Sequence, residues 1–352
     1  MPLIPNPYRS QDGLDLPDIP LPFDDAAPVQ ALLARCPAAG ATPLTALPAI
    51  AQEVGVAEVW AKDERARMGL GSFKALGAAY VIAADAAAAN PDAPQGALEG
   101  RTYVTASAGN HGLSVAAGAR VFGARAVVYL SDTVPDSFAQ RLEAKGAEVV
   151  RAGQTYEASM DAAAMAADEN GWTLLSDSSW PGYTDSPRVL MQGYLALMAE
   201  VTEAMAQPPT HIFVQAGVGG LAAAVAAAAR AAWGDAPCIV VVEPTAAACI
   251  ADSLSQGQPT LARGPVSSMG RLDCKEASLI ALRGLARDAD HVFTLTDRAV
   301  EDHLPPLADL GMATTPSGGA SLAALICTTA QDREALGLDD GARVLTFVTE
   351  EP

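Results

Sequence analysis

The sequence predicts an α/β fold with two lobes, each a parallel β-sheet covered by helices on both faces. Three observations support this prediction. Of the 352 residues, 50% are hydrophobic and only 18% are charged, which is enough apolar material for one large core or two medium ones. Short β-branched runs alternate with alanine-rich, helix-like stretches. Runs such as AVVYL and IVVVE are apolar on both faces, as is typical of buried parallel strands.

The expected elements alternate between strand and helix along the chain. The β-branched runs predict strands at 58–62, 102–106, 124–130, 147–152, 211–215, 238–243 and 342–348. The alanine-rich stretches predict helices that include 112–123, 137–146 and 221–233. The proline-containing segment QPPTH at 207–211 indicates a break between two such units, so we expect one lobe before it and another after it.

Charge and cysteine content restrict the possible partners. A net charge of −19 would repel nucleic-acid phosphates and anionic lipids, so we expect neither nucleic acid nor a membrane as a partner. The first residues lack a basic region followed by an apolar core, and we therefore expect a cytoplasmic protein. The five cysteines are scattered without C-x-x-C spacing, which argues against a disulfide framework and against a metal site. A small-molecule substrate remains.

Ligands of such sheets bind where strands end and helices begin, and three junctions of this kind carry candidate residues. In the first, Gly217, Gly219 and Gly220 follow the expected strand 211–215. Small residues let backbone N–H groups approach an anion, and the start of the next helix adds partial positive charge, which suits a phosphate. An ordinary tight turn would need similar glycines, so both interpretations stay open here.

The second junction is the segment SAGNHG at 107–112, between the expected strand 102–106 and the helix that follows. Its serine, glycine and asparagine can cap that helix and present several amides to a carboxylate or to a ring oxygen. A plain helix N-cap would account for the same residues.

The third junction contains Lys74, within GSFK. Only four of the 22 basic residues are lysines, so lysine is not the usual surface cation of this chain. A lysine at the start of a helix is unfavourable because the helix dipole disfavours a cation there. The same effect would lower the pKa of the amine, which suits a nucleophile or a base.

Taken in order, GSFK (71–74), SAGNHG (107–112) and GVGGL (217–221) resemble the motifs of the fold type II enzymes that use pyridoxal 5'-phosphate, with a tryptophan synthase β-like fold. Longer segments, among them DSSWPGYTDSPRVLMQGY (177–194) and MGRLDCKEAS (269–278), resemble the diaminopropionate ammonia-lyase branch of that family. The resemblance extends over nearly the whole chain.

This resemblance implies a large cofactor-binding domain formed by residues 1–80 and 190–352, a small domain formed by residues 81–189, and a homodimer. It also implies β-elimination on a small β-substituted amino acid, giving a 2-oxo acid and ammonia, with 2,3-diaminopropionate as the leading substrate. A dehydratase of a β-hydroxy amino acid such as serine, threonine or 3-hydroxyaspartate is the alternative. A β-replacement synthase and a non-enzymatic binding protein are further possibilities.

Matched residue by residue, the resemblance implies that Lys74 holds the cofactor as a Schiff base and removes the Cα proton of the substrate. Asp177 would act as a further acid/base near the substrate. Asn110 would contact the hydroxyl of the pyridine ring, and Thr349 would face the pyridine nitrogen. The phosphate would be bound by the amides of Gly217, Val218, Gly219, Gly220 and Leu221.

Substrate contacts are expected from Ser107, Ala108, Gly109, His111 and Arg271. Ala108 stands where the ammonia-lyases carry an aspartate, so one of their two carboxylates is missing and we expect a preference for the L-amino acid. Arg271 stands where they carry a glycine, which indicates another β-leaving group. From the residues alone, His111 is as readily a structural histidine and Arg271 a solvated loop cation.

Overall fold

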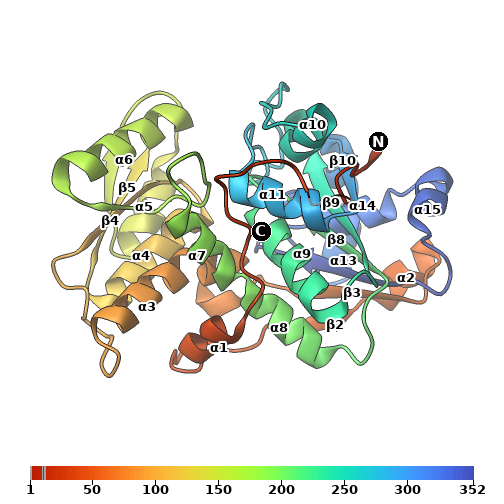
Figure 1. The fold of residues 1–352 in the computed structure, drawn as a ribbon, viewed down its shortest axis with the longest axis horizontal. Helices are drawn as coiled ribbons and strands as arrows, with labels where there is room; N and C mark the ends of the chain where they lie inside the picture. Colours follow the sequence, from red (N-terminus) through yellow and green to blue (C-terminus); the bar gives the residue numbers. More distant parts are fainter. Residues whose placement is uncertain (1, 10, 12) are drawn as a thin grey trace.

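The computed structural model describes residues 2–9, 11 and 13–352. It has two sheets, one of seven strands and one of four, which lie in two lobes side by side (Figure 1). The predicted class, two α/β lobes built on parallel sheets, is confirmed.

The larger sheet consists of strands from both ends of the chain. Its order is β1 (Leu3–Pro5), β10 (His291–Leu295), β9 (Cys238–Pro244), β8 (His211–Gln215), β11 (Arg343–Val348), β3 (Glu58–Asp63) and β2 (Leu44–Ala46). The central strands β10, β9, β8, β11 and β3 are parallel, whereas β1 and β2 pair antiparallel at the two edges.

Helices cover both faces of this sheet. They are α2 (Pro48–Val54), α8 (Leu195–Ala204), α9 (Gly220–Trp233), α10 (Cys249–Gln256), α11 (Leu279–Asp288), α12 (Asp297–Glu301), α13 (Leu304–Asp309), α14 (Ala320–Ile326) and α15 (Ala330–Leu336). Alternate residues of β8 enter two different cores: Ile212 and Val214 pack with α8, α9 and α11, whereas Phe213 packs with α2 and α14. Side chains that alternate between two buried faces explain why the strand is apolar throughout.

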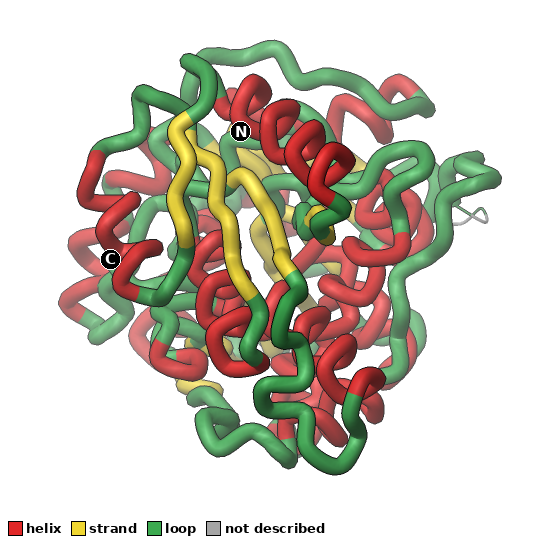
Figure 2. The backbone as a smooth tube through the Cα atoms, turned by 90° about the vertical axis from the view of Figure 1, so that its left-hand side faces the viewer, coloured by secondary structure: helices red, strands yellow, loops and turns green. Residues whose placement is uncertain are grey.

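The smaller sheet is parallel and comes from one continuous part of the chain. Its order is β6 (Glu148–Arg151), β5 (Arg125–Leu130), β4 (Thr102–Ala106) and β7 (Thr173–Leu174). Its helices are α3 (Ala78–Ala89), α4 (Asn110–Phe122), α5 (Asp136–Ala144) and α6 (Tyr156–Asn170). Figure 2 shows this lobe from its outer side, with the strands running next to one another among the helices.

The remaining helices connect the lobes or lie in loops. They are α1 (Ala27–Leu33), α7 (Asp185–Gly193) and the short 3-10 turns Arg67–Gly69, Phe73–Leu76 and Thr245–Ala247. In Figure 1, α7 lies between the two lobes, and the chain also ends between them.

Each of the seven predicted strands is present within one residue at either end, and the three predicted helices within two. The expected lobe boundary at 207–211 is wrong. Glu58 of β3 lies opposite Arg343 of β11, so strands from before and after this segment share the larger sheet. The finer division into domains of 1–80 with 190–352 and of 81–189 stays a prediction.

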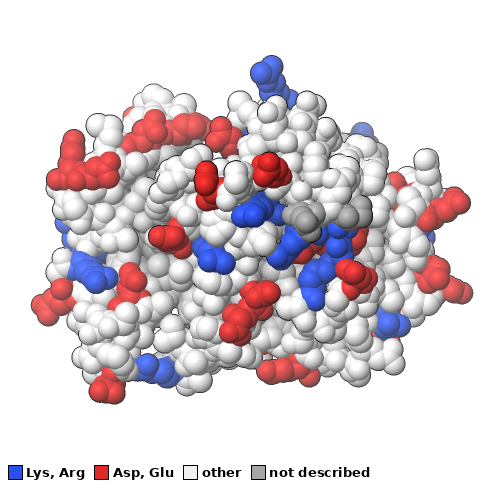
Figure 3. All heavy atoms as spheres, in the orientation of Figure 1, with Lys and Arg blue, Asp and Glu red and all other residues white. Residues whose placement is uncertain are grey.

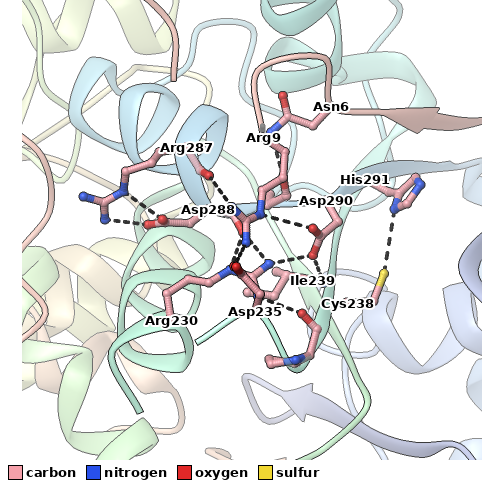
Figure 4. A network of polar contacts seen from close by, with 12 residues as sticks. Asn6, Arg9, Arg230, Asp235, Cys238, Ile239, Arg287, Asp288, Asp290 and His291 are labelled. Carbon is pink, nitrogen blue, oxygen red and sulfur yellow. Dashed lines mark hydrogen bonds and ion pairs between the residues drawn. The ribbon is translucent and has the colours of Figure 1, made fainter. Parts of the chain in front are cut away.

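A polar network attaches the N-terminal segment to the larger lobe (Figure 4). The Asn6 side-chain amide donates to main-chain carbonyls at the end of α11, those of Leu285 (3.1 Å), Ala286 (2.9 Å) and Ala289 (2.7 Å). Arg9 and Arg230 both pair with Asp290, at 3.2 and 2.6 Å. These contacts satisfy carbonyls that a helix end would otherwise leave free.

The face shown in Figure 3 carries interspersed acidic and basic side chains and no broad basic surface. Within the described residues, no helix combines the length and the apolar character needed to cross a bilayer. The same part of the chain contains no group of three or more His, Cys, Asp or Glu residues arranged to hold a metal ion.

Candidate active site

The first group of the candidate site is the pair Lys74 and Asp177. Lys74 lies in the 3-10 turn immediately before α3, and Asp177 lies in the loop that follows β7. The Nζ atom of Lys74 is 2.6 Å from Oδ2 of Asp177, and the two side chains are 21% and 20% exposed. The structure therefore brings the two residues expected to be catalytic into direct contact.

Lys74 and Asp177 each shift the pKa of the other. Burial, the largest influence, would lower the pKa of Lys74, but attraction to Asp177, Tyr194 and Cys274 and the hydrogen bond to Asp177 together raise it above its ordinary value. Burial alone would raise the pKa of Asp177, but the Lys74 ammonium lowers it well below its usual range. The expectation of a lowered pKa for Lys74 is wrong, because the residue precedes α3 in a separate turn and a carboxylate lies against it.

Two aromatic rings flank the Lys74 amine. The Nζ atom lies 5.3 Å from the centroid of the Phe73 ring and 5.9 Å from that of Tyr194. Burial raises the pKa of the Tyr194 phenol to about 12, so this group is neutral near pH 7. Sequence reasoning did not assign either ring to the site, since aromatic residues of this kind are also common in cores.

The turn that carries Lys74 is bound to the end of β11. The Phe73 amide donates to the Thr349 carbonyl at 3.1 Å, and the Glu351 amide donates to the Gly71 carbonyl at 2.9 Å. Between these two contacts, Ser72 and Glu350 form an isolated antiparallel bridge. The position of the amine is thus set by the carboxyl end of a strand in the middle of the larger sheet.

The second group of the site centres on the buried carboxylate of Glu350. Asn110, the first residue of α4, donates from Nδ2 to its Oε2 at 2.6 Å. Arg271 donates from Nε to the same oxygen at 3.3 Å, and the Thr315 hydroxyl donates to Oε1. Asn110 and Arg271 were expected in the site, whereas Glu350 and Thr315 were not. An acidic residue directly after the last buried strand is the signal that could have identified Glu350.

Thr349 lies next to this group at the carboxyl edge of β11. Its hydroxyl accepts a hydrogen bond from Nε2 of Gln215 at 3.2 Å. The same amide lies 3.2 Å from the Ser317 carbonyl oxygen and 3.0 Å from that of Gly318. Thr349 is therefore held at the correct edge of the sheet, and its role toward a pyridine nitrogen stays a prediction.

The glycine loop between β8 and α9 is tightly enclosed. A Cβ atom added at Gly217 would lie 2.9 Å from the Arg271 carbonyl oxygen and 3.0 Å from Sγ of Cys274. Gly219 is the N-cap of α9 and has a φ of +96°, a conformation that favours glycine. Leu221 is buried in the first turn of the helix. The loop thus places backbone amides at the start of a long helix, and glycine at 217, 219 and 220 adds no side chain of its own over them.

Cys274 lies close to Gly217 of this loop, and its thiol is also influenced by the charges of Asp177 and Lys74. Burial raises the pKa of its thiol to about 12, and the nearby Asp177 carboxylate contributes to this rise. The thiol is therefore neutral near pH 7, and we assign it no catalytic part.

The segment 107–112 forms the loop before α4. The Ser107 hydroxyl accepts a hydrogen bond from the Gly109 amide at 3.2 Å, and Ala108 contributes no titratable group. His111 is buried, its Nε2 lies 2.8 Å from the Leu175 carbonyl oxygen, and burial lowers its pKa. A neutral, main-chain-bonded imidazole suits a structural role, and a contact between His111 and a substrate stays a prediction.

These residues fit pyridoxal 5'-phosphate. The Lys74 amine could hold its aldehyde carbon, and the uncovered amides of loop 217–221 could bind its phosphate. The Asn110 side chain offers an amide donor for the ring hydroxyl, and Thr349 or Glu350 could face the ring nitrogen.

Comparisons with known proteins agree with this fit. The family model described as "Pyridoxal-phosphate dependent enzyme" matches residues 36–350. The diaminopropionate ammonia-lyase of Salmonella typhimurium is 34% identical over 284 residues, which is 75% of this chain and 70% of that protein. A mouse (Mus musculus) serine dehydratase-like protein is 28% identical over 288 residues, or 81% of each chain.

Solved structures give the same result. The diaminopropionate ammonia lyase of Escherichia coli, in complex with an aminoacrylate-PLP azomethine reaction intermediate, superimposes with a TM-score of 0.88 at 27% identity. The superposition covers 99% of this chain and 93% of that one. This chain therefore belongs to the family of pyridoxal-phosphate-dependent enzymes, on the side of the family that includes the ammonia-lyases and dehydratases.

Proposed function

We propose that this protein catalyses β-elimination on a small β-substituted L-amino acid and releases a 2-oxo acid and ammonia. The observation that supports the proposal is the 2.6 Å contact between Lys74 and Asp177, two titratable groups that could exchange a proton. Similarity to ammonia-lyases and dehydratases supports the same reaction class.

When bound, pyridoxal phosphate supplies an electron sink for the charge that develops at Cα. With cofactor and substrate bound, the released Lys74 amine would be neutral and could take the proton from Cα, and the short contact would let this proton reach the departing β-group by way of Asp177. Asp177 then protonates the departing β-group, so that it leaves as a neutral molecule. The remaining enamine takes up water and yields the 2-oxo acid and ammonia.

The similarity to diaminopropionate ammonia-lyases makes 2,3-diaminopropionate the leading substrate, which would give pyruvate and two molecules of ammonia. A β-hydroxy amino acid, as in a dehydratase, is the second candidate. Two observations favour it: the dehydratase-like relatives and the cationic Arg271 beside the substrate loop. A homodimer and a cytoplasmic location belong to the same proposal, with the family resemblance as support for the dimer.

This function can be tested by screening the holoenzyme with the D- and L-enantiomers of β-substituted amino acids. Both the 2-oxo acid and the ammonia released are measured. Two ammonia per oxo acid would indicate a diamine, and one would indicate a hydroxy amino acid. Oxo acid formed only at background level, with turnover restored by an added nucleophile, would instead indicate a β-replacement synthase. The Lys74→Ala variant is the negative control, and no turnover of any such substrate would contradict the proposal.

A further inference from the structure

Arg271 joins three segments of the candidate site. Its amide donates to the Ser317 hydroxyl at 3.0 Å, and its carbonyl oxygen lies close to Gly217 of the glycine loop. Its guanidinium lies against the loop before α4, since a Cβ atom added at Gly109 would be 3.5 Å from its Nε, Cζ and Nη1 atoms. Arg271 is therefore not a solvated loop cation away from the site.

Most of the donors of this guanidinium are unused. Among the described residues, Arg271 makes one side-chain hydrogen bond, from Nε to Glu350 at 3.3 Å. Its two terminal nitrogens have no partner among the same residues. A guanidinium can hold a carboxylate through two parallel N–H donors, and the terminal nitrogens retain that capacity.

Glu350 is buried, whereas its partner Arg271 is partly exposed to solvent. The Glu350 side chain is 6% exposed, and both of its oxygens already accept hydrogen bonds from Asn110, Arg271 and Thr315. The Arg271 side chain is 40% exposed. A molecule that enters beside Gly109 would therefore meet the cation of this pair and not its carboxylate.

We infer that Arg271 binds a second carboxylate of the substrate, carried on the β-carbon, and so selects acidic β-hydroxy amino acids over cationic diamines. The inference rests on the proposed β-elimination and, within it, favours the second candidate substrate, a β-hydroxy amino acid, over 2,3-diaminopropionate. The first turn of α4 has no side-chain cap, so its main-chain amides could hold the α-carboxylate common to all amino acids. A β-ammonium group would face a like charge, which costs affinity, whereas a β-carboxylate would gain a charge-assisted bidentate contact.

The test compares the holoenzyme with Arg271→Gln, Arg271→Lys and the matched control Arg263→Gln. Arg263 is exposed and lines a separate surface hollow with Asp252 and Gln258. The substrates are L-serine, L-3-hydroxyaspartate and L-2,3-diaminopropionate, and kcat/KM is measured for each. Calorimetry with succinate and propionate reports binding independently of turnover.

The parent and Arg263→Gln should favour 3-hydroxyaspartate. Arg271→Gln should lose about 10- to 100-fold on this substrate alone, which is about 1.4–2.8 kcal/mol, because glutamine keeps one neutral donor but neither the charge nor the paired donors. It should also gain on the diamine and bind succinate no better than propionate. Arg271→Lys should retain part of the preference, because lysine keeps the positive charge but lacks the two parallel N–H donors of the guanidinium.

Two results would overturn the inference: equal losses on all three substrates, which would assign Arg271 to the α-carboxylate, or an unchanged substrate ranking. If the parent turned over none of the substrates, the proposed function would fail, and calorimetry would still decide the inference. Succinate that bound no better than propionate to the parent would then refute a carboxylate site at Arg271.

Discussion

The Nζ atom of Lys74 and the Oδ2 atom of Asp177 lie 2.6 Å apart, although the two residues are 103 positions apart in the sequence. This contact joins the turn before α3 to the loop after β7. Because each residue holds the other in its charged form, the amine carries the proton of this pair, directly beside the carboxylate. We therefore predict a different effect for the substitution of each residue.

Lys74→Ala should abolish covalent attachment of the cofactor. Reduction of the holoenzyme with borohydride should fix pyridoxal phosphate to Lys74, as seen by peptide mass spectrometry. The matched variant Lys145→Ala, at the end of α5, should retain the adduct. An adduct found at Lys62, Lys145 or Lys275 would show that the site has been assigned to the wrong amine.

Asp177→Asn should lower kcat by about 10²- to 10⁴-fold on the L-substrate, the usual contribution of a positioned acid/base, with the cofactor still bound. Bound cofactor is measured by its visible absorbance. Asp185→Asn, at the exposed first turn of α7, is the control and should remain active.

The residues at positions 108 and 177 also predict which enantiomer of the substrate the enzyme prefers. Ala108 cannot carry a proton, so in the proposed function Asp177 would serve as acid/base on one face of the substrate. The parent enzyme should therefore prefer the L-amino acid strongly. Comparable kcat/KM values for D and L forms of one substrate would show that another group protonates the opposite face.

Local sequence patterns were sufficient for most of the fold. The predicted strands were found because each is a β-branched run between turn residues. The edge strands β1 and β2 and the short β7 contain two or three residues each, too few for any periodicity. β10, with the sequence HVFTL, does carry the β-branched signal and could have been predicted. Pairing between β3 and β11 could not, because it depends on contacts across most of the chain.

Some residues of the candidate site could also be predicted from the sequence, and others could not. Lys74, Asn110 and the glycine loop each lie at a strand–helix junction that the sequence marks. The pKa of Lys74 was predicted with the wrong sign because a neighbouring carboxylate, and not the helix dipole, determines it. Glu350 was missed for a similar reason, since its burial among Asn110, Arg271 and Thr315 arises only when distant segments meet.

Gly219→Ala should weaken cofactor binding by about tenfold or more, because a shift of the amides at the start of α9 loses hydrogen bonds to a charged phosphate. Gly337→Ala is the matched control: Gly337 has a φ of +65° at the end of α15 and nothing within 4 Å of an added Cβ. Both variants should lose stability, since a left-handed residue costs about 1–2 kcal/mol in a non-glycine. Equal retention of cofactor after dialysis in the two variants would place the phosphate elsewhere.

Acid should destabilise the protein partly through His211. Its Nε2 lies 3.0 Å from the Leu336 carbonyl oxygen, and burial lowers its pKa in the folded state. A group with a lowered folded pKa contributes stability that is complete above its unfolded pKa, about 6.5, and is lost as the pH falls through the folded value. The free energy of unfolding, from urea titrations, should therefore fall as the pH drops below about 6.5, and less steeply in His211→Gln. Identical slopes in parent and variant would contradict this assignment.

Asn6→Ala should destabilise the fold through the end of α11. The Asn6 amide is buried and donates to three main-chain carbonyls there, while its Oδ1 accepts from the Tyr8 amide at 3.0 Å. Removing the amide leaves the buried Ala286 and Ala289 carbonyls without this donor, whereas the Leu285 carbonyl still accepts from the Ala289 amide, and the loss costs about 1–3 kcal/mol. The free energy of unfolding should fall by that amount, whereas Gln11→Ala, which removes an exposed amide from the same segment, should change it by less than about 0.5 kcal/mol. A similar, small change in both variants would mean that the N-terminal strand, and not the Asn6 contacts, attaches this segment to the larger sheet.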